Sequence, residues 1–238
     1  MKWKSSFLCF VLAAVLFGAC RSVPDSILKD KELNDFVKAP LFGMIYDDRN
    51  RPCQGVSVSI MEFSPAGTER EKEPLRNSVY TDINGRFVLT DMRRGSYRIL
   101  AEKKGFEPTE AVFDFTNRNQ VLYIQIISFE SLLYRAEESL KTNDYPSALN
   151  YLERAGRLEE KHPAVLYMKA VCYYNGGKFD DAETLLLEVE AQGNGNFYTF
   201  LLLADVYGFG LKKRDSELLY LKKAYNIYAD EEIKRRME

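Results

Sequence analysis

Between about residues 40 and 128, apolar and polar residues alternate, which is the pattern of β-strands that bury one face. Turn-forming pairs such as Asn84-Gly85 and Lys104-Gly105 separate the alternating runs, and Asn-Gly suits a tight hairpin because both residues tolerate positive φ. Short strands at this spacing predict an antiparallel β-sandwich of about seven strands. The residues expected to face its core are Val56, Val58, Ile60, Phe87, Leu89, Tyr97, Ile99, Ala101, Leu122, Ile124 and Ile126.

After Ile127 the periodicity becomes helical, and from about 129 to 238 the sequence resembles itself at a spacing of 34 residues. Helix-boundary signals accompany the spacing: Asp144 precedes Pro146 as an N-cap, and Gly176-Gly177 ends a helix. About three helix-turn-helix units stacked as an α-solenoid are expected, so the chain is predicted to be α+β with two domains. The recurring positions are Ala136, Ala170 and Ala204, Tyr145 and Phe179, Ala148 and Ala182, and Tyr173 and Tyr207.

The 34-residue period resembles that of tetratricopeptide repeats, although the third unit departs from it. There, Gly208-Phe209-Gly210 loosens the turn, and Ala224 lies 35 residues after Val189, which predicts one inserted residue. The resemblance implies a concave face, formed by the first helix of each unit, that binds a peptide or a partner protein. The Lys and Asn pattern that clamps a C-terminal carboxylate in chaperone-binding members is absent.

Register places the candidate partner-binding groove on the first helix of each unit. An alternative is that several aromatic residues of this set pack against neighbouring units, since aromatic positions on helices are usually core. The candidate groove residues are Leu133, Glu137, Lys141, Tyr167, Val171, Tyr174, Asn175, Tyr198, Leu201 and Asp205.

The sandwich segment, 40–128, carries an ordered set of short motifs. They are Gly43-x-Ile45-x-Asp47, Pro52-x-x-Gly55-Val56-x-Val58, Thr81-Asp82-x-Asn84-Gly85-x-Phe87, Gly95-x-Tyr97 and Gly105-Phe106. Their order resembles the carboxypeptidase regulatory-like (transthyretin-like) β-sandwich family, which implies an accessory or binding module without catalysis of its own. Asp82 and Asn84 suggest a calcium loop, but further acidic ligands and a closing Glu are missing. Asp82 is therefore expected to hold its turn by accepting backbone N–H bonds.

The first residues, 1–19, are predicted to form an export signal. Lys2 and Lys4 precede an almost wholly apolar run from Phe7 to Ala19, which is shorter than the about 20 residues that span a bilayer. The ending Phe17-Gly18-Ala19-Cys20 resembles a bacterial lipobox, which implies cleavage before Cys20 and lipid attachment to its sulfur. The alternative is an ordinary secretory signal with a chance cysteine.

A lipidated tether, 20–39, is expected to follow, with one short helix from Ser26 to Val37. Arg21, directly after the cysteine, resembles the sorting signal for an outer membrane, which implies a lipid-anchored protein of the bacterial envelope that faces the periplasm. The charged run Glu69 to Glu73, between two strands, is expected to be a solvated loop, with a partner contact as the alternative.

Composition excludes several classes of function. The 33 basic and 35 acidic residues give a net charge of −2, so nucleic acid is not an expected partner. The sequence has no close-spaced cluster of His and Cys, so neither a metal site nor a cofactor is expected. The single histidine, His162, is expected to be a solvated turn residue. Cys53 and Cys172 are expected to remain buried free thiols rather than a disulfide. Adjacent acids such as Asp47-Asp48 point apart and are poor acid–base pairs, so no enzyme is expected.

Two hypotheses of function follow. The first is a membrane-anchored envelope scaffold that binds a protein or peptide partner through its tetratricopeptide repeats. The alternative is a glycan or peptidoglycan binder that acts through the loops of the β-sandwich, where Phe106 is the obvious aromatic candidate.

Overall fold

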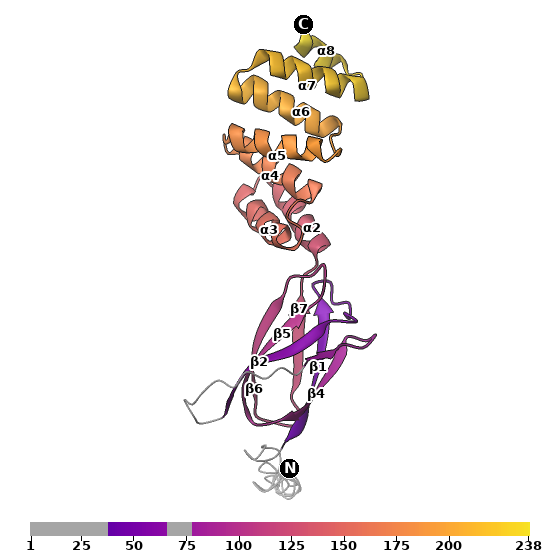
Figure 1. Cartoon of the computed structure of the whole chain (residues 1–238), viewed down its shortest axis with the longest axis vertical. Helices are drawn as coiled ribbons and strands as arrows, with labels where there is room; N and C mark the ends of the chain where they lie inside the picture. The colour runs from indigo at the N-terminus through magenta and orange to yellow at the C-terminus, as the bar shows by residue number, and fades with distance from the viewer. Residues whose placement is uncertain (1–37, 66–77) are drawn as a thin grey trace, which may run out of the picture.

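The computed structural model describes residues 38–65 and 78–238, which form a strand-rich module followed by a helical module in one elongated molecule (Figure 1). The predicted signal peptide, Cys20, the tether helix and the charged run at 69–73 lie outside the described residues. Among the helices described, none is both long and apolar enough to cross a membrane. The predicted α+β class with two domains is confirmed.

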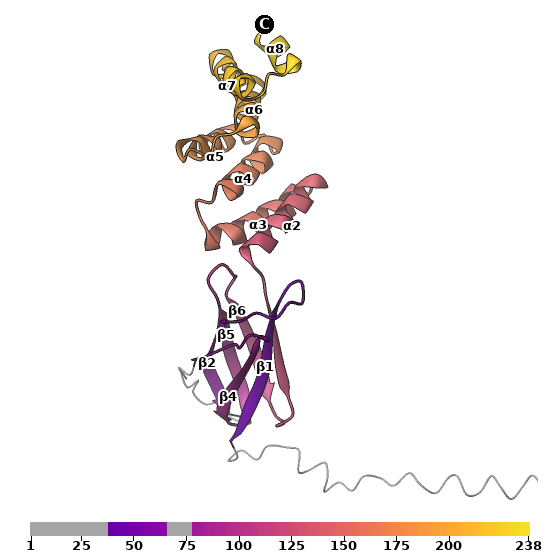
Figure 2. The same ribbon diagram turned by 90° about the vertical axis from the view of Figure 1, so that its right-hand side faces the viewer.

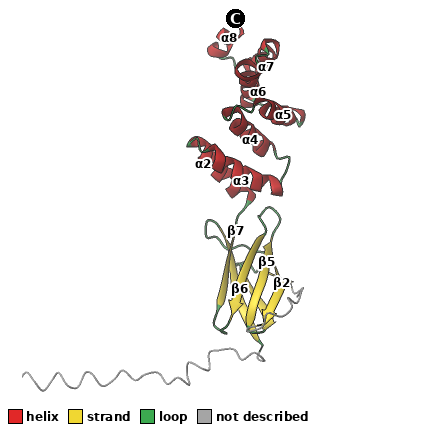
Figure 3. Cartoon of the chain, turned by 90° about the vertical axis from the view of Figure 1, so that its left-hand side faces the viewer, coloured by secondary structure: helices red, strands yellow, loops and turns green. Residues whose placement is uncertain are grey.

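Among the described residues, seven strands form two sheets that pack as a sandwich (Figure 3). One sheet has the order β4-β1-β7 and the other the order β3-β2-β5-β6. The strands are β1 (Ala39–Asp47), β2 (Ser57–Pro65), β3 (Ser78–Tyr80), β4 (Arg86–Met92), β5 (Gly95–Glu102), β6 (Thr109–Phe115) and β7 (Val121–Ile126).

The sandwich core contains every residue that the alternating pattern predicts to face inward, since each of them is buried. Leu41, Phe63 and Phe115 complete this core with almost no exposed surface. Alternation therefore identified the buried face correctly, because successive side chains of a strand point to opposite faces of the sheet.

One strand pair departs from the antiparallel expectation. β1 pairs with β7 in parallel, with Phe42 opposite Val121 and Asp47 opposite Ile126. Both strands run toward the helical module, and β7 delivers the chain to the first helix there (Figure 1). Alternation predicts which face of a strand is buried but carries no information about strand direction. The parallel pairing of β1 with β7 could therefore not be predicted from the sequence.

Asp82 holds the β-turn before β4 as predicted. Its Oδ1 accepts the backbone N–H of Asn84 at 2.9 Å and that of Arg86 at 2.8 Å, while Gly85 takes the left-handed conformation. A Cβ at Gly85 would meet the carbonyl oxygen of Ile45, so the position needs glycine for space as well as for φ.

The helical module consists of three helix pairs and a terminal helix (Figures 1 and 2). Asp144 caps the second helix through the N–H of Ser147, with Pro146 in its first turn, and Gly176 with Gly177 ends the third, as predicted. The helices are α2 (Phe129–Lys141), α3 (Tyr145–Leu158), α4 (Pro163–Asn175), α5 (Phe179–Ala191), α6 (Phe197–Asp205), η1 (Val206–Leu211), α7 (Arg214–Ile227) and α8 (Glu231–Met237).

The inserted residue of the third unit is absorbed by a π-helix. The segment η1 continues directly from α6, and a π-turn holds one residue more than the α-turn it replaces. Gly208 and Gly210 do not loosen this turn but allow close packing. A Cβ at Gly208 would meet the carboxylate of Glu217, and one at Gly210 would meet the Phe179 ring.

Polar contacts join the sandwich to α2. Asp48 accepts a hydrogen bond from the Ser131 hydroxyl at 2.8 Å and pairs with the Arg135 guanidinium at 3.0 Å. The backbone N–H of Phe129 donates to Gly105 in the β5–β6 loop at 2.9 Å. The neighbouring Asp47 forms an ion pair with Arg51 instead. The two adjacent carboxylates therefore have different partners, in agreement with the expectation that they point apart.

Candidate partner-binding groove

The first helices of the three units are α2, α4 and α6, and they carry the ten residues proposed for the groove (Figure 2). Leu133, Tyr167 and Leu201 occupy the same position in successive units, 34 residues apart, and each is half-buried. Glu137, Lys141, Asn175 and Tyr198 are exposed, and Val171, Tyr174 and Asp205 are half-buried. None of the ten is fully buried, so all of them present some surface to solvent.

Several of these residues also pack within the helical module. Tyr167, Tyr174 and Leu201 rest against the core that α4, α5, α6 and α7 share, and Leu133 rests against the core at α2 and α3. Packing within the repeats, the alternative interpretation, is therefore confirmed for Tyr167 and Tyr174, whereas Tyr198 is exposed and the binding role of this set stays a prediction.

A hollow of about 320 Å³ lies between α6 and α8. Of the ten proposed residues it brings together Leu201 and Asp205. Its apolar wall is formed by Phe197, Leu201 and Ile233, and its polar wall by Asp205, Asp230, Glu232 and Arg236.

Two of the proposed tyrosines, Tyr167 and Tyr174, have raised pKa values. Burial raises the pKa of Tyr167 on α4, and Tyr198 on α6 raises it further. Burial also raises the pKa of Tyr174, with a further increase from Asp205 and a decrease from Arg236. Of the proposed residues in the second and third units, Tyr167, Tyr174 and Leu201 pack against one shared core.

The proposed residues at the end of α2 lie outside this shared core. Lys141 pairs with Glu138 at 2.8 Å and with Glu137 at 3.1 Å, and these hydrogen bonds raise the pKa of its ammonium. All three side chains are about half exposed, so this cluster is a solvent-exposed set of ion pairs near the C-terminal end of α2.

Sequence reasoning missed Arg236 on α8. Its guanidinium lies 2.8 Å from Asp205 and 3.3 Å from Glu217, which ties α8 to α6 and α7. Burial raises the pKa of Asp205, and Arg236 opposes that shift. The available signal was the spacing, since Arg236 follows Leu201 by 35 residues, the repeat period with its one inserted residue.

His162 is not the solvated turn residue that was expected. Its Nδ1 accepts the backbone N–H of Ala164 at 3.3 Å as the N-cap of α4, and its ring packs edge-on against Phe129 with centroids 4.8 Å apart. A histidine before Pro163 is placed to cap the helix that this proline begins, which is the physical reason for the difference.

The other candidate chemistry can be placed as well. Cys53 and Cys172 are both buried free thiols, Cys53 in the sandwich and Cys172 in the helical module, as expected. Burial raises the pKa of the Cys172 thiol to about 11, so it carries little thiolate at neutral pH. Within 38–65 and 78–238, no three His, Cys, Asp or Glu side chains converge as metal ligands.

Comparison with known proteins identifies repeats in the helical module. The tetratricopeptide-repeat family model matches residues 139–205. No curated protein matches the sequence.

Solved structures with a similar helical fold include YrrB, described as a tetratricopeptide-repeat protein with an unusual peptide-binding site (19% identity, 45% of this chain and 55% of that chain, TM-score 0.42). The first repeat domain of Spaghetti (RPAP3) bound to an HSP90 peptide shares 14% identity over 46% of this chain and 86% of that chain, with a TM-score of 0.43. A repeat protein from Bacteroides fragilis shares 15% identity over 46% and 50%, with a TM-score of 0.37. The helical half of the chain contains tetratricopeptide repeats, as its 34-residue spacing predicts.

Proposed function

We propose that the chain is a lipid-anchored scaffold of the bacterial envelope that binds a protein or peptide partner through the first helices of its repeats. Acylated Cys20 holds it to a membrane, by preference the outer membrane on the periplasmic side. The repeats supply the binding surface and the β-sandwich positions them. The proposal assigns no catalysis to the chain.

One observation carries the binding part of the proposal. Tyr198 is 66% exposed on α6, and its ring lies 5.3 Å from the ring of Phe197, which lines the hollow together with Leu201. Large aromatic side chains that are packed on one side and open on the other are the type that dominates binding energy at protein interfaces.

Site-specific photo-crosslinking in cells tests this proposal. A photoreactive residue in place of Tyr198 is expected to capture a discrete partner, whereas one in place of Leu219, an exposed residue of the second helix α7, is expected to capture none. The pair Tyr198→Ala and Leu201→Ala, made in one chain, should weaken the partner at least about tenfold, or about 1.4 kcal/mol. Equal capture at both positions would contradict a groove on the first helices.

The anchor has its own test. Cys20→Ser is expected to block acylation, which is measured by metabolic labelling with a fatty acid and by the mass of the mature chain. Fatty-acid labelling of the Cys20→Ser chain, or a lack of labelling of the wild-type chain, would contradict the lipid anchor. Neither result would bear on the partner-binding groove.

The alternative of a glycan-binding site has little support in the sandwich loops that the structure describes. Phe106 is half-buried, packs against the sandwich core and lies under the Lys103 ammonium at 5.1 Å. It also forms an isolated bridge with Ser128 at the junction. This ring is therefore unsuited to the stacking platform that a sugar needs.

A further inference from the structure

The outer face of the sheet β4-β1-β7 is apolar where a solvated face would be polar. Strand register places Val88, Phe42 and Val121 side by side in one row across the three strands. The next row has Arg86, Met44 and Tyr123. Phe42 is 49% exposed and Tyr123 is 61% exposed. We call the five apolar side chains, Phe42, Met44, Val88, Val121 and Tyr123, the outer apolar face.

This face is hollowed as well as apolar. A depression of about 670 Å³ is lined by all five of its side chains, and Val79 and Tyr80 of β3 border it. Arg86 and Asp82 supply its charges, and Arg86 forms no ion pair with any described acid. Contiguous exposed apolar surface with a polar border marks an interaction site more often than chance exposure does.

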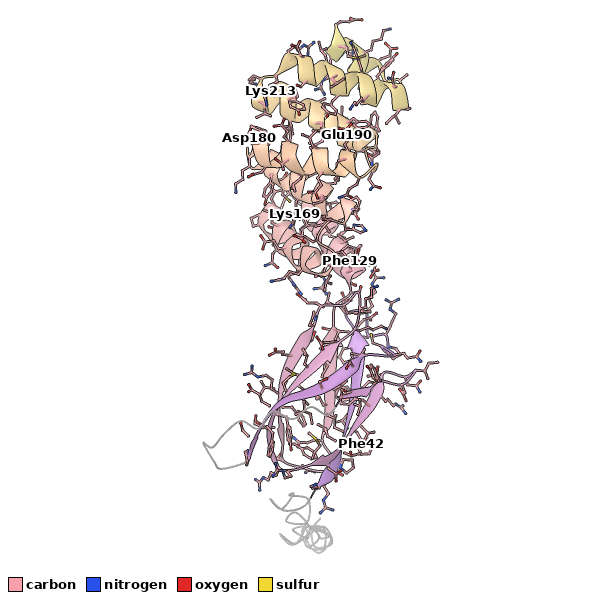
Figure 4. All side chains as sticks on the ribbon, viewed as in Figure 1. Phe42, Phe129, Lys169, Asp180, Glu190 and Lys213 are labelled. Atoms are coloured by element: carbon pink, nitrogen blue, oxygen red, sulfur yellow. The ribbon has the colours of Figure 1, made fainter. Side chains whose placement is uncertain are left out.

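The outer apolar face lies at the end of the sandwich where the chain enters it. Figure 4 shows Phe42 near the N-terminal end of β1, whereas Phe129 lies at the junction with the helices. Phe42 is four residues from Lys38, where the described chain begins, and Cys20 precedes Lys38 by 18 residues in sequence.

The same end of the sandwich is basic among the described residues. Register brings the β4–β5 turn and the β6–β7 turn to the start of β1, since Ala39 faces Met92 and Phe42 faces Val121. Lys38 precedes β1, and the two turns carry Arg93, Arg94 and Arg118. The acids nearest to them are Asp91, near the end of β4, and Asp114, near the end of β6.

We propose that the outer apolar face rests on a lipid bilayer with anionic headgroups, an inference that uses the anchor of the proposed function. Aromatic rings such as Phe42 and Tyr123 favour the boundary between headgroups and acyl chains. The basic end favours anionic phosphates at the same depth, and an anchor in the segment before β1 brings this end of the protein to the bilayer.

A second copy of the chain is a poorer occupant. A stable protein interface buries about 800 Å² on each partner, and five side chains over two rows of three strands offer much less. A bilayer needs no matching shape, so a small apolar face with a basic border is sufficient for it.

Depth-dependent quenching tests the proposal on the full chain bound to vesicles of phosphatidylethanolamine and phosphatidylglycerol with brominated acyl chains. The one tryptophan of the sequence, Trp3, lies in the predicted signal peptide and is lost on cleavage before Cys20, so Tyr123→Trp places a single reporter in the outer apolar face. The matched control is Tyr134→Trp on α2, where the replaced ring is 54% exposed. The reporter in the face is expected to lose roughly half its emission and to shift to the blue, because an interfacial face sinks about 5–10 Å below the headgroups. The α2 reporter is expected to keep the emission of a water-exposed indole.

Flotation of the vesicles separates this proposal from the anchor. A chain that floats while the Tyr123→Trp reporter stays unquenched would overturn the membrane face and leave the anchor standing. A reporter that responds to soluble peptidoglycan fragments and not to lipid would overturn it in favour of a glycan site. Phe42→Ser in the reporter chain should remove most of the quenching without changing flotation, and unchanged quenching would also count against the face.

Discussion

Arg154 on α3 forms a bidentate ion pair with Glu107 of the β-sandwich. The Nη2 atom of Arg154 lies 2.6 Å from Oε2 of Glu107, and its Nε lies 3.0 Å from Oε1. Both side chains are only about one-quarter exposed, so this bidentate pair is stronger than an ordinary surface ion pair. Together with the Asp48 contacts to α2, it holds the repeats in a defined orientation on the sandwich.

Glu107→Gln is therefore expected to loosen the junction. Removing the charge should lower the free energy of unfolding by about 1 kcal/mol, because the pair is partly screened by solvent. Chemical denaturation measures the loss, and limited proteolysis near residues 127–129 should become faster. Glu153→Gln, on the exposed side of the same helix, is the control and should change neither. Equal effects of the two substitutions on the free energy of unfolding and on the proteolysis rate would show that the Arg154–Glu107 pair does not stabilise the junction.

The same pair predicts a pH dependence. The hydrogen bond from Arg154 holds the pKa of Glu107 below its usual value of 4.5, although burial opposes the shift. A carboxyl group with a lowered pKa in the folded state binds protons more weakly there than in the unfolded state, so its stabilisation is present above about pH 4.5 and is lost as the pH falls through the folded pKa. The stability difference between wild type and Glu107→Gln, measured by denaturation from pH 7 to pH 3, should shrink at the acid end. A difference that is constant over this range would contradict the role of the charge.

Substitution by alanine is expected to have opposite outcomes at Gly210, in the π-turn η1, and at Gly156, in α3. Gly210→Ala should lower the free energy of unfolding by about 1–3 kcal/mol, because the added methyl group meets the Phe179 ring in a packed core. Gly156→Ala, inside α3, is the matched control: its Cβ would come no closer than 3.5 Å to Lys169, and alanine favours the helix by up to about 1 kcal/mol. Thermal unfolding of both variants checks this. A neutral Gly210→Ala would mean that η1 relaxes away from α5.

The buried Thr81, directly after β3, is hydrogen-bonded to the connection between β1 and β2. The Thr81 hydroxyl donates to the carbonyl of Cys53 at 2.6 Å and accepts the N–H of Val56 at 2.9 Å. Thr81→Val keeps the shape and leaves both backbone groups unsatisfied, so a loss of about 1–3 kcal/mol is expected by urea denaturation. Thr90→Val, exposed on β4, should stay within about 0.5 kcal/mol of wild type. If the two substitutions cost the same, the hydrogen bonds of Thr81 contribute little.

The sequence alone was sufficient for features that depend on local periodicity. Alternation at Val58 and Ile60 identified the buried face of β2, because strand geometry fixes a period of two. The 34-residue recurrence of alanine identified the repeat, because only small residues fit where its helices cross, and Ala136, Ala170 and Ala204 are all fully buried. The extra residue before Ala224 was also visible in the spacing, and the π-turn η1 accommodates it.

Features that depend on long-range contacts were decided by the tertiary structure. The role of Arg236 exists because α8 folds back beside α6 and brings the guanidinium to Asp205. The ring of His162 packs on Phe129 because α4 lies beside α2. The parallel pairing of β1 with β7 set Phe42 beside Val121 and so assembled an apolar face from strands far apart in sequence. The physical reason is the same in each case: periodicity states which side of an element is apolar, and only the packing of distant elements determines what each side meets.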